Sequence, residues 1–93
     1  MTYEWDAQKA KSNLQKHGLD FEEASTVFLD PLALTFPDPG HSILERRELT
    51  IGCTIKGQVV FVAHCERNRR IRLISARPAT RSERKEYEEG FDS

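Results

Sequence analysis

Residues 58–77, QVVFVAHCERNRRIRLISAR, contain two apolar segments separated by a short arginine-rich segment. Residues 58–65 are apolar on both alternating faces, which is typical of a strand in the middle of a sheet. Residues 71–76 predict a second strand, and the polar residues 67–70 predict the hairpin turn between the two. The stretch therefore predicts an antiparallel pair of strands at the centre of the fold.

Two further strands are expected before this hairpin. Residues 32–36 form a short apolar segment. Residues 46–55 alternate between apolar side chains, such as Leu49 and Ile51, and polar ones, which is the pattern of a half-buried strand. Together with the hairpin, these segments predict a four-stranded antiparallel sheet.

Helix signals lie on both sides of the predicted sheet. Asp6 can cap a first helix, and His17-Gly18 ends it. Asp20 begins a capping box before a second helix, which ends at Asp30-Pro31 because the residue before proline avoids the helical region. Thr80 begins another capping box, which predicts a C-terminal helix.

The length and composition fit one small soluble domain. The 93 residues supply one modest core, and 38% hydrophobic with 31% charged residues is ordinary for a globular fold. No apolar run approaches the ~20 residues of a membrane span, and no secretory signal is visible, so we expect a cytoplasmic protein without a membrane partner. The prediction is one α+β domain over residues 1–93, with two N-terminal helices, a four-stranded antiparallel sheet and a C-terminal helix.

The charge is distributed unevenly along the chain. Residues 66–85 carry eight Lys/Arg and two Asp/Glu, a net charge of +6, whereas the whole chain has a net charge of −1. A local excess of this size attracts polyanions. Two interpretations stay open: the arginines bind phosphate or RNA, or they form ion pairs with the acidic residues of 1–65.

Arginines are the main candidates for phosphate binding, because the planar, permanently charged guanidinium matches phosphate oxygens. Arg72 lies inside the last predicted strand, and Arg77 lies at its end, before a helix. Both are expected to contribute to a cationic surface. The other arginines of this segment with a predicted role are Arg67, Arg70 and Arg81.

Three further residues are candidates for general acid–base chemistry. His64 ends the central strand beside the arginine-rich turn, and His17 lies at a helix terminus. Glu45 begins the long strand, where alternation places it with Arg47 on the face of Leu49. A structural role for either histidine, and a salt-bridge cluster around Glu45, stay open as alternatives.

Signals for metal or cofactor binding are absent from the sequence. Cys53 and Cys65 are predicted to be reduced thiols in strands, because their spacing matches no zinc motif. The sequence has no phosphate-binding glycine-rich loop, nucleophile elbow or helical histidine pair. If the chain is an enzyme, we therefore expect a mechanism without metal or cofactor.

Short motifs over nearly the whole chain resemble the BrnT toxin family. Each motif alone is weak, but their combination and order are specific. Pro78 departs from the pattern, since a basic residue is expected there. The motifs include Glu4-Trp5-Asp6, Lys16-His17-Gly18, Phe21-Glu22-Glu23-Ala24, Asp30-Pro31, Glu45-Arg46-Arg47, Ile71-Arg72, Ile74-Ser75-Ala76-Arg77, Glu83 and Tyr87.

The resemblance implies a toxin of a type II toxin–antitoxin pair, with a fold similar to RelE-type ribonucleases. It implies a metal-independent endoribonuclease that cleaves RNA and inhibits translation. It also implies a BrnA-like ribbon-helix-helix antitoxin as partner, and operator DNA bound through the toxin–antitoxin complex. A homodimer within that complex stays open.

The expected mechanism uses the 2′-OH of RNA as the nucleophile, with cations that stabilise charge on the phosphate. The base would be His64 or Glu45, and the acid His17 or an arginine. Two alternatives stay open: a module that binds nucleic acid or antitoxin without cleavage, and a ribonuclease that acts only on ribosome-bound mRNA. The predicted cation clamp consists of Arg77, Arg67 and Arg72, supported by Arg47.

Overall fold

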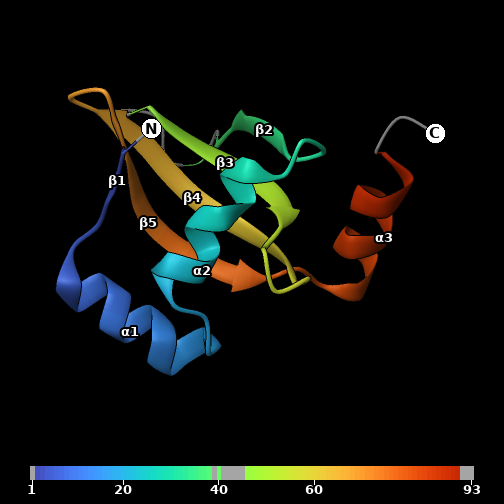
Figure 1. Cartoon of the computed structure of the whole chain (residues 1–93), viewed down its shortest axis with the longest axis horizontal. Coiled ribbons are helices and arrows are strands. Elements are labelled where there is room, and N and C mark those ends of the chain that lie inside the picture. Colours follow the sequence, from blue (N-terminus) through green and yellow to red (C-terminus); the bar gives the residue numbers. More distant parts are fainter. Residues whose placement is uncertain (1, 39, 41–45, 91–93) are drawn as a thin grey trace.

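The computed structural model describes residues 2–38, 40 and 46–90. Within these residues, Figure 1 shows one twisted sheet, with α2 in front of it, α1 below β5 and α3 beyond the end of β5. The elements are β1 (Thr2–Glu4), α1 (Ala7–His17), α2 (Phe21–Ser25), the 3-10 helix η1 (Thr26–Leu29), β2 (Leu34–Pro37), β3 (Arg47–Cys53), β4 (Val59–Arg67), β5 (Arg70–Pro78) and α3 (Arg81–Glu89).

The sheet is mixed and has the strand order β1-β5-β4-β3-β2. The α+β class is confirmed, but the prediction of a purely antiparallel four-stranded sheet is wrong, because β1 adds a fifth strand parallel to β5. Tertiary contacts stabilise this short strand. The Tyr3 ring stacks on Phe28 at 5.4 Å, and Glu4 forms an ion pair with Arg72 at 2.9 Å. Three residues carry no periodic pattern from which the strand could be predicted.

The predicted caps at Asp6 and Thr80 are present, whereas at Asp20 only the side-chain cap of the predicted capping box is shown. The Asp6 carboxylate accepts a hydrogen bond from Lys9 N at 3.0 Å, and the Asp20 carboxylate accepts one from Glu23 N at 2.7 Å. Thr80 forms the expected capping box at the start of α3. Such a cap stabilises a helix by ~1 kcal/mol and fixes where the chain enters it.

The second predicted helix is shorter than expected and continues as a 3-10 helix. The hydroxyl groups of Ser25 and Thr26 donate to the carbonyl oxygens of Glu22 and Glu23, at 2.8 and 2.6 Å. Side chains that bond to the preceding turn compete with regular helix geometry, and 3-10 turns are common at helix ends. The change of helix type directs η1 across β3.

The turn between β4 and β5 lies where the sequence predicted it, and the strands on both sides extend into it. Only Asn68 and Arg69 lie outside the strands, with φ angles of 52° and 64°. Two consecutive positive φ angles are the mark of a type I′ hairpin turn, which matches strand twist. The predicted hairpin turn over residues 67–70 is therefore confirmed, since a β-turn includes the residue on each side of its central pair and Arg67 pairs with Arg70 across the strands.

The core lies between the sheet and α1, α2 and η1. Asn13 joins α1 to β5: its Nδ2 donates to Ala76 O at 2.8 Å and to Leu19 O at 3.0 Å, and its Oδ1 accepts from Ala76 N at 3.0 Å. The main cluster of buried apolar side chains consists of Leu19, Phe21, Ala24, Val27, Val60, Val62, Leu73 and Ala76.

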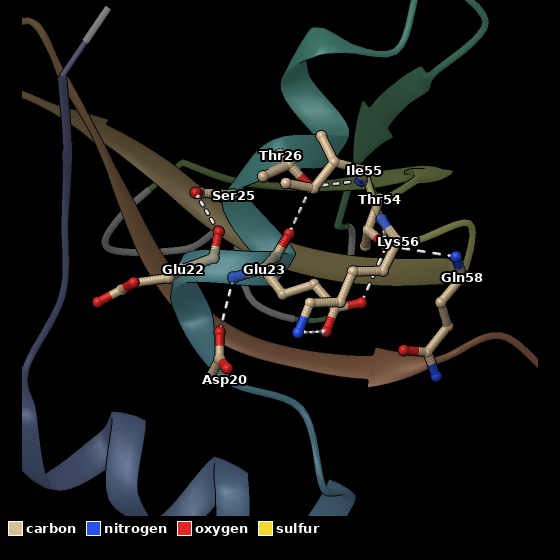
Figure 2. Close-up of polar contacts among 9 residues, drawn as sticks. All are labelled: Asp20, Glu22, Glu23, Ser25, Thr26, Thr54, Ile55, Lys56 and Gln58. Atoms are coloured by element: carbon tan, nitrogen blue, oxygen red, sulfur yellow. Dashed lines mark hydrogen bonds and ion pairs between the residues drawn. The ribbon is translucent and has the colours of Figure 1, made fainter.

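The β3–β4 turn is fastened to α2 and η1 by polar contacts (Figure 2). Thr54 Oγ1 donates to the Glu23 carboxylate at 2.9 Å, and Ile55 N donates to Thr26 Oγ1 at 3.0 Å. Lys56 Nζ lies 4.0 Å from the same carboxylate. These contacts hold the far end of β3 and β4 against the helices, and so fix the register of the strands that carry the candidate site.

Two smaller expectations concern cysteines and membranes. Cys53 is partly exposed and Cys65 is buried, and neither forms a disulfide. Across residues 2–38, 40 and 46–90, no helix is long and apolar enough to cross a membrane.

Candidate nucleic-acid interface

The candidate residues divide between the two faces of the sheet. Val60, Val62 and His64 alternate onto the face covered by α1, α2 and η1, which we call the helix face. Phe61 and Cys65 alternate onto the opposite side. We call that side the arginine face and define it by Arg47, Phe61, Cys65, Arg72 and Arg77, which the strand register places together.

Arg47 and Arg72 lie on either side of Cys65 on the arginine face. Cys65 pairs with Arg47 on β3 and with Arg72 on β5, so the two arginine backbones are two strand spacings apart, roughly 10 Å. Arg72 Nη1 also donates to Glu4 Oε2 at 2.9 Å. Glu4 thus orients Arg72 and partly neutralises it, while both side chains keep 27% of their surface exposed. A phosphate placed between the two arginines would meet donors from both sides.

The hairpin tip, defined as Arg67, Arg69 and Arg70, concentrates three exposed arginines at one end of this face. Arg67 and Arg70 are directly opposite each other, an arrangement that destabilises an antiparallel pair when the charges are alike. Arg69 adds a positive φ angle of 64°, which a residue other than glycine or asparagine adopts at a cost. Bound phosphate would relieve the repulsion.

Arg77 differs from these arginines because its guanidinium already forms several hydrogen bonds within the protein. Its Nη1 and Nη2 donate to the two carboxylate oxygens of Glu83 at 2.8 and 2.9 Å, and Nη1 donates to Pro78 O at 3.2 Å. This fork lowers the pKa of Glu83 to about 2 and raises the pKa of Arg77. The Arg77 Cζ atom also lies 4.9 Å from the centre of the Phe61 ring, and Phe61 contacts Phe36 edge to face at 6.2 Å.

His64 lies on the helix face, away from the arginines. Its Nε2 atom is 2.7 Å from Thr50 Oγ1, and its ring packs edge to face on Phe28 at 5.0 Å. Only 4% of the residue is exposed. Burial lowers the pKa of His64, while Glu48 raises it by a smaller amount. The structure therefore does not bring His64 together with Arg72 and Arg77.

The other candidates lie at the periphery or outside the described residues. His17 lines a hollow between the end of α1 and Ser75 of β5. Arg81 is exposed at the start of α3. Glu45 lies outside the residues that the structure describes. Among the described residues, neither His17 nor Arg81 forms a hydrogen bond or an ion pair with Arg72 or Arg77.

Two groups near the interface are not among the predicted site residues. The Phe61–Phe36 pair underlies Arg77, and the Asp30 carboxylate joins α3 to the sheet by accepting from Tyr87 Oη and from Cys53 N at 2.8 Å. Burial acts to raise the pKa of Asp30, but the hydrogen bonds from Tyr87 and backbone N–H groups lower it overall. Strand alternation alone could have placed Phe61 on the face of the sheet opposite to that of His64. The Tyr87–Asp30 contact spans 57 residues, so no local sequence pattern indicates it.

Metal ligands are sparse in the part of the chain that the structure describes. There, no three or more His, Cys, Asp or Glu side chains are grouped so that they could hold a metal ion. The chemistry that the described residues offer is that of cationic donors around a phosphate, with aromatic rings beside them.

Comparisons with known proteins identify the family and a similar fold. A family model described as the ribonuclease toxin BrnT of type II toxin–antitoxin systems matches residues 5–83. The crystal structure of the Brucella abortus ribonuclease toxin BrnT is similar, with a TM-score of 0.68 and 25% sequence identity over 87% of this chain and 100% of that chain. No curated protein matches.

Proposed function

We propose, from the premise that this chain belongs to the BrnT family of ribonuclease toxins of type II toxin–antitoxin systems, that it cleaves RNA on the arginine face. The observation that carries the proposal is the placement of Arg47 and Arg72 on either side of Cys65, next to the hairpin tip. Three strands bring these cations to one surface, where they can surround a phosphodiester.

The proposed reaction is an internal phosphoryl transfer that needs no metal. The 2′-oxygen of one ribose attacks the adjacent phosphorus, the bond from phosphorus to the 5′-oxygen breaks, and the products carry a 2′,3′-cyclic phosphate and a 5′-hydroxyl. The base takes the 2′-OH proton and the acid gives one to the departing oxygen. Arg47, Arg67 and Arg72 stabilise the charge that builds on the phosphate oxygens.

The proposed roles of base and acid take the accessibility of His64 into account. His64 is buried and bonded to Thr50 on the helix face, which supports Glu45 as the base in its place. Glu45 precedes Arg47 by two residues in the sequence. His17 or one of the arginines acts as the acid. Arg70 and Arg81 bind flanking phosphates of the RNA.

The partner of the toxin, in this proposal, is a BrnA-like ribbon-helix-helix antitoxin. Acidic segments of the antitoxin would cover the arginine face and so exclude RNA. The toxin released from it cleaves RNA and inhibits translation, and the complex binds operator DNA through the antitoxin. A homodimer of toxin within the complex is compatible with this arrangement.

Cleavage of naked RNA in EDTA tests the proposal. We expect the purified protein to produce 2′,3′-cyclic phosphate ends, and Arg47→Gln to reduce the rate by at least tenfold, as loss of a transition-state donor does. Lys9→Gln, an exposed charge on α1, is the matched control and should cleave like the parent. Circular dichroism checks the folding of each variant.

The rival functions predict other results. Cleavage only in the presence of ribosomes would indicate a ribosome-dependent enzyme. Tight RNA or antitoxin binding without cleavage under either condition would overturn the proposal in favour of a binding module.

A further inference from the structure

We propose that the side of the Arg77 guanidinium away from Phe61 stacks on one unpaired base of the RNA. Arg77 would then contact a base and not bind a phosphate. The inference rests on the proposed ribonuclease function and deepens it, since it names single-stranded RNA as the substrate class. It also gives Arg77 a role different from those of Arg47 and Arg72 on the same face.

Most of the N–H donors in the plane of the Arg77 guanidinium already bond to acceptors within the protein. Both hydrogens of Nη1 are used, one for Glu83 Oε1 at 2.8 Å and one for Pro78 O at 3.2 Å. Nη2 donates to Glu83 Oε2 at 2.9 Å. Three of the five guanidinium N–H donors are therefore occupied inside the protein. A phosphate could bind in the guanidinium plane only by competing with Glu83.

The two sides of the guanidinium have different surroundings. On one side lies the Phe61 ring, with Arg77 Cζ 4.9 Å from the ring centre, and Phe36 contacts that ring edge to face at 6.2 Å. The Arg77 side chain nevertheless keeps 43% of its surface exposed. The Glu83 fork occupies one edge of the guanidinium and Phe61 lies on one side of it, so we assign the stacking contact to the side of the guanidinium away from Phe61. RNA bases stack on guanidinium planes of this kind.

The distance between Arg72 and Arg77 determines which base of the RNA Arg77 can contact. Arg72 and Arg77 pair with Cys65 and Phe61, which are four residues apart on β4, because β5 has one extra residue where the register shifts; the two arginines therefore share the arginine face at a separation of about 13 Å at ~3.3 Å per residue. Stacked nucleotides rise about 3.4 Å each, so the base lies within about four nucleotides of the phosphate held at Arg72. A base inside a duplex has both faces covered by its neighbours and cannot stack on Arg77.

The test compares Arg77→Lys with the parent in RNA binding, because lysine keeps the charge and loses the plane. The probes are a 2′-O-methyl RNA octamer, which cannot cleave itself, and an abasic 2′-O-methyl octamer with the same phosphates. Fluorescence anisotropy at several salt concentrations gives the affinity and its salt dependence. Arg84→Lys, the same change at an exposed position of α3, is the matched control.

We expect the parent to bind the octamer with bases about tenfold more tightly than the abasic one. Arg77→Lys should lose this preference with an unchanged salt slope, and Arg84→Lys should keep it. Glu83→Gln, which retains the helix cap but removes the carboxylate fork, should also reduce the preference.

Other outcomes overturn the inference. Equal binding of both probes by the parent would exclude a base contact, even if unmodified RNA is cleaved. A preference that survives in Arg77→Lys, or a salt slope that falls by about 0.7 in Arg77→Gln, would make Arg77 a phosphate ligand. Failure of the proposed function itself is distinct, since the parent would then cleave no unmodified RNA.

Discussion

Replacement of Asn13 by alanine should destabilise the fold more than any other single polar change on α1. The side chain is 7% exposed and makes three hydrogen bonds, to Ala76 N, Ala76 O and Leu19 O. Its loss leaves three buried backbone groups without this partner, at about 1–3 kcal/mol each. Because water can enter part of the vacated space, we expect a loss of roughly 3–5 kcal/mol out of a typical total of about 5–15 kcal/mol.

Urea unfolding followed by circular dichroism measures this loss. With a slope of about 2 kcal/mol per molar urea, the midpoint of Asn13→Ala should fall by about 2 M. Gln15→Ala removes an exposed amide from the same helix and should change the midpoint little. A loss below about 1 kcal/mol for Asn13→Ala would refute the reasoning.

Asn13→Asp gives a sharper version of the test. A carboxylate accepts from Ala76 N but faces the carbonyl oxygens of Ala76 and Leu19 with an oxygen where the amide donates. We expect the loss relative to the parent to be large at pH 7 and smaller at pH 5. The pKa of the new carboxyl is raised in the fold, so protonation restores stability as the pH falls. Parent-like stability at pH 7 would contradict the donor role of the amide.

Three further predictions concern the helix face and α3. Burial lowers the pKa of His64, so its contribution to the free energy of unfolding should be constant above about pH 6.5 and should decrease as the pH falls below that value. Urea titrations of the parent at pH 7.5 and 5.5 should show this decrease. The same titrations of His64→Gln should show a smaller decrease. Gly52→Ala would place a Cβ 3.1 Å from Val27 Cβ, so thermal unfolding should reveal a loss of about 1–3 kcal/mol. Tyr87→Phe removes the hydrogen bond to Asp30, so amide exchange of α3 should accelerate several-fold while the sheet stays protected.

Local signals explain which parts of the fold could be predicted. The caps at Asp6, Asp20 and Thr80 depend on residues three positions away, so the sequence is sufficient to place those helix starts. Strand β1 and the Asn13 contact depend on partners more than 60 residues away, and no local pattern encodes them. The fold was therefore predictable except where distant segments meet.

The candidate site was predictable in composition but not in arrangement. His64 and Arg67 are close in sequence, yet strand alternation turns His64 to the helix face and Cys65 to the arginine face. The Arg77–Glu83 fork links a strand to the next helix, and its geometry depends on the capping box at Thr80. Charge counting shows that the segment is basic, whereas only the register shows which arginines share a surface.

The Asn13 contact also bears on self-association. β1 pairs with β5 only at residues 70–72, so the backbone of Ala76 lies where a strand from a second molecule could be added. Asn13 supplies the donor and acceptor that such a strand would offer, but a side-chain amide has no further edge to continue the ladder. At the opposite edge, Pro37 of β2 lacks an N–H group. A second copy therefore cannot extend the sheet at Ala76 without first displacing Asn13, so this side chain protects the sheet edge against strand-by-strand polymerisation.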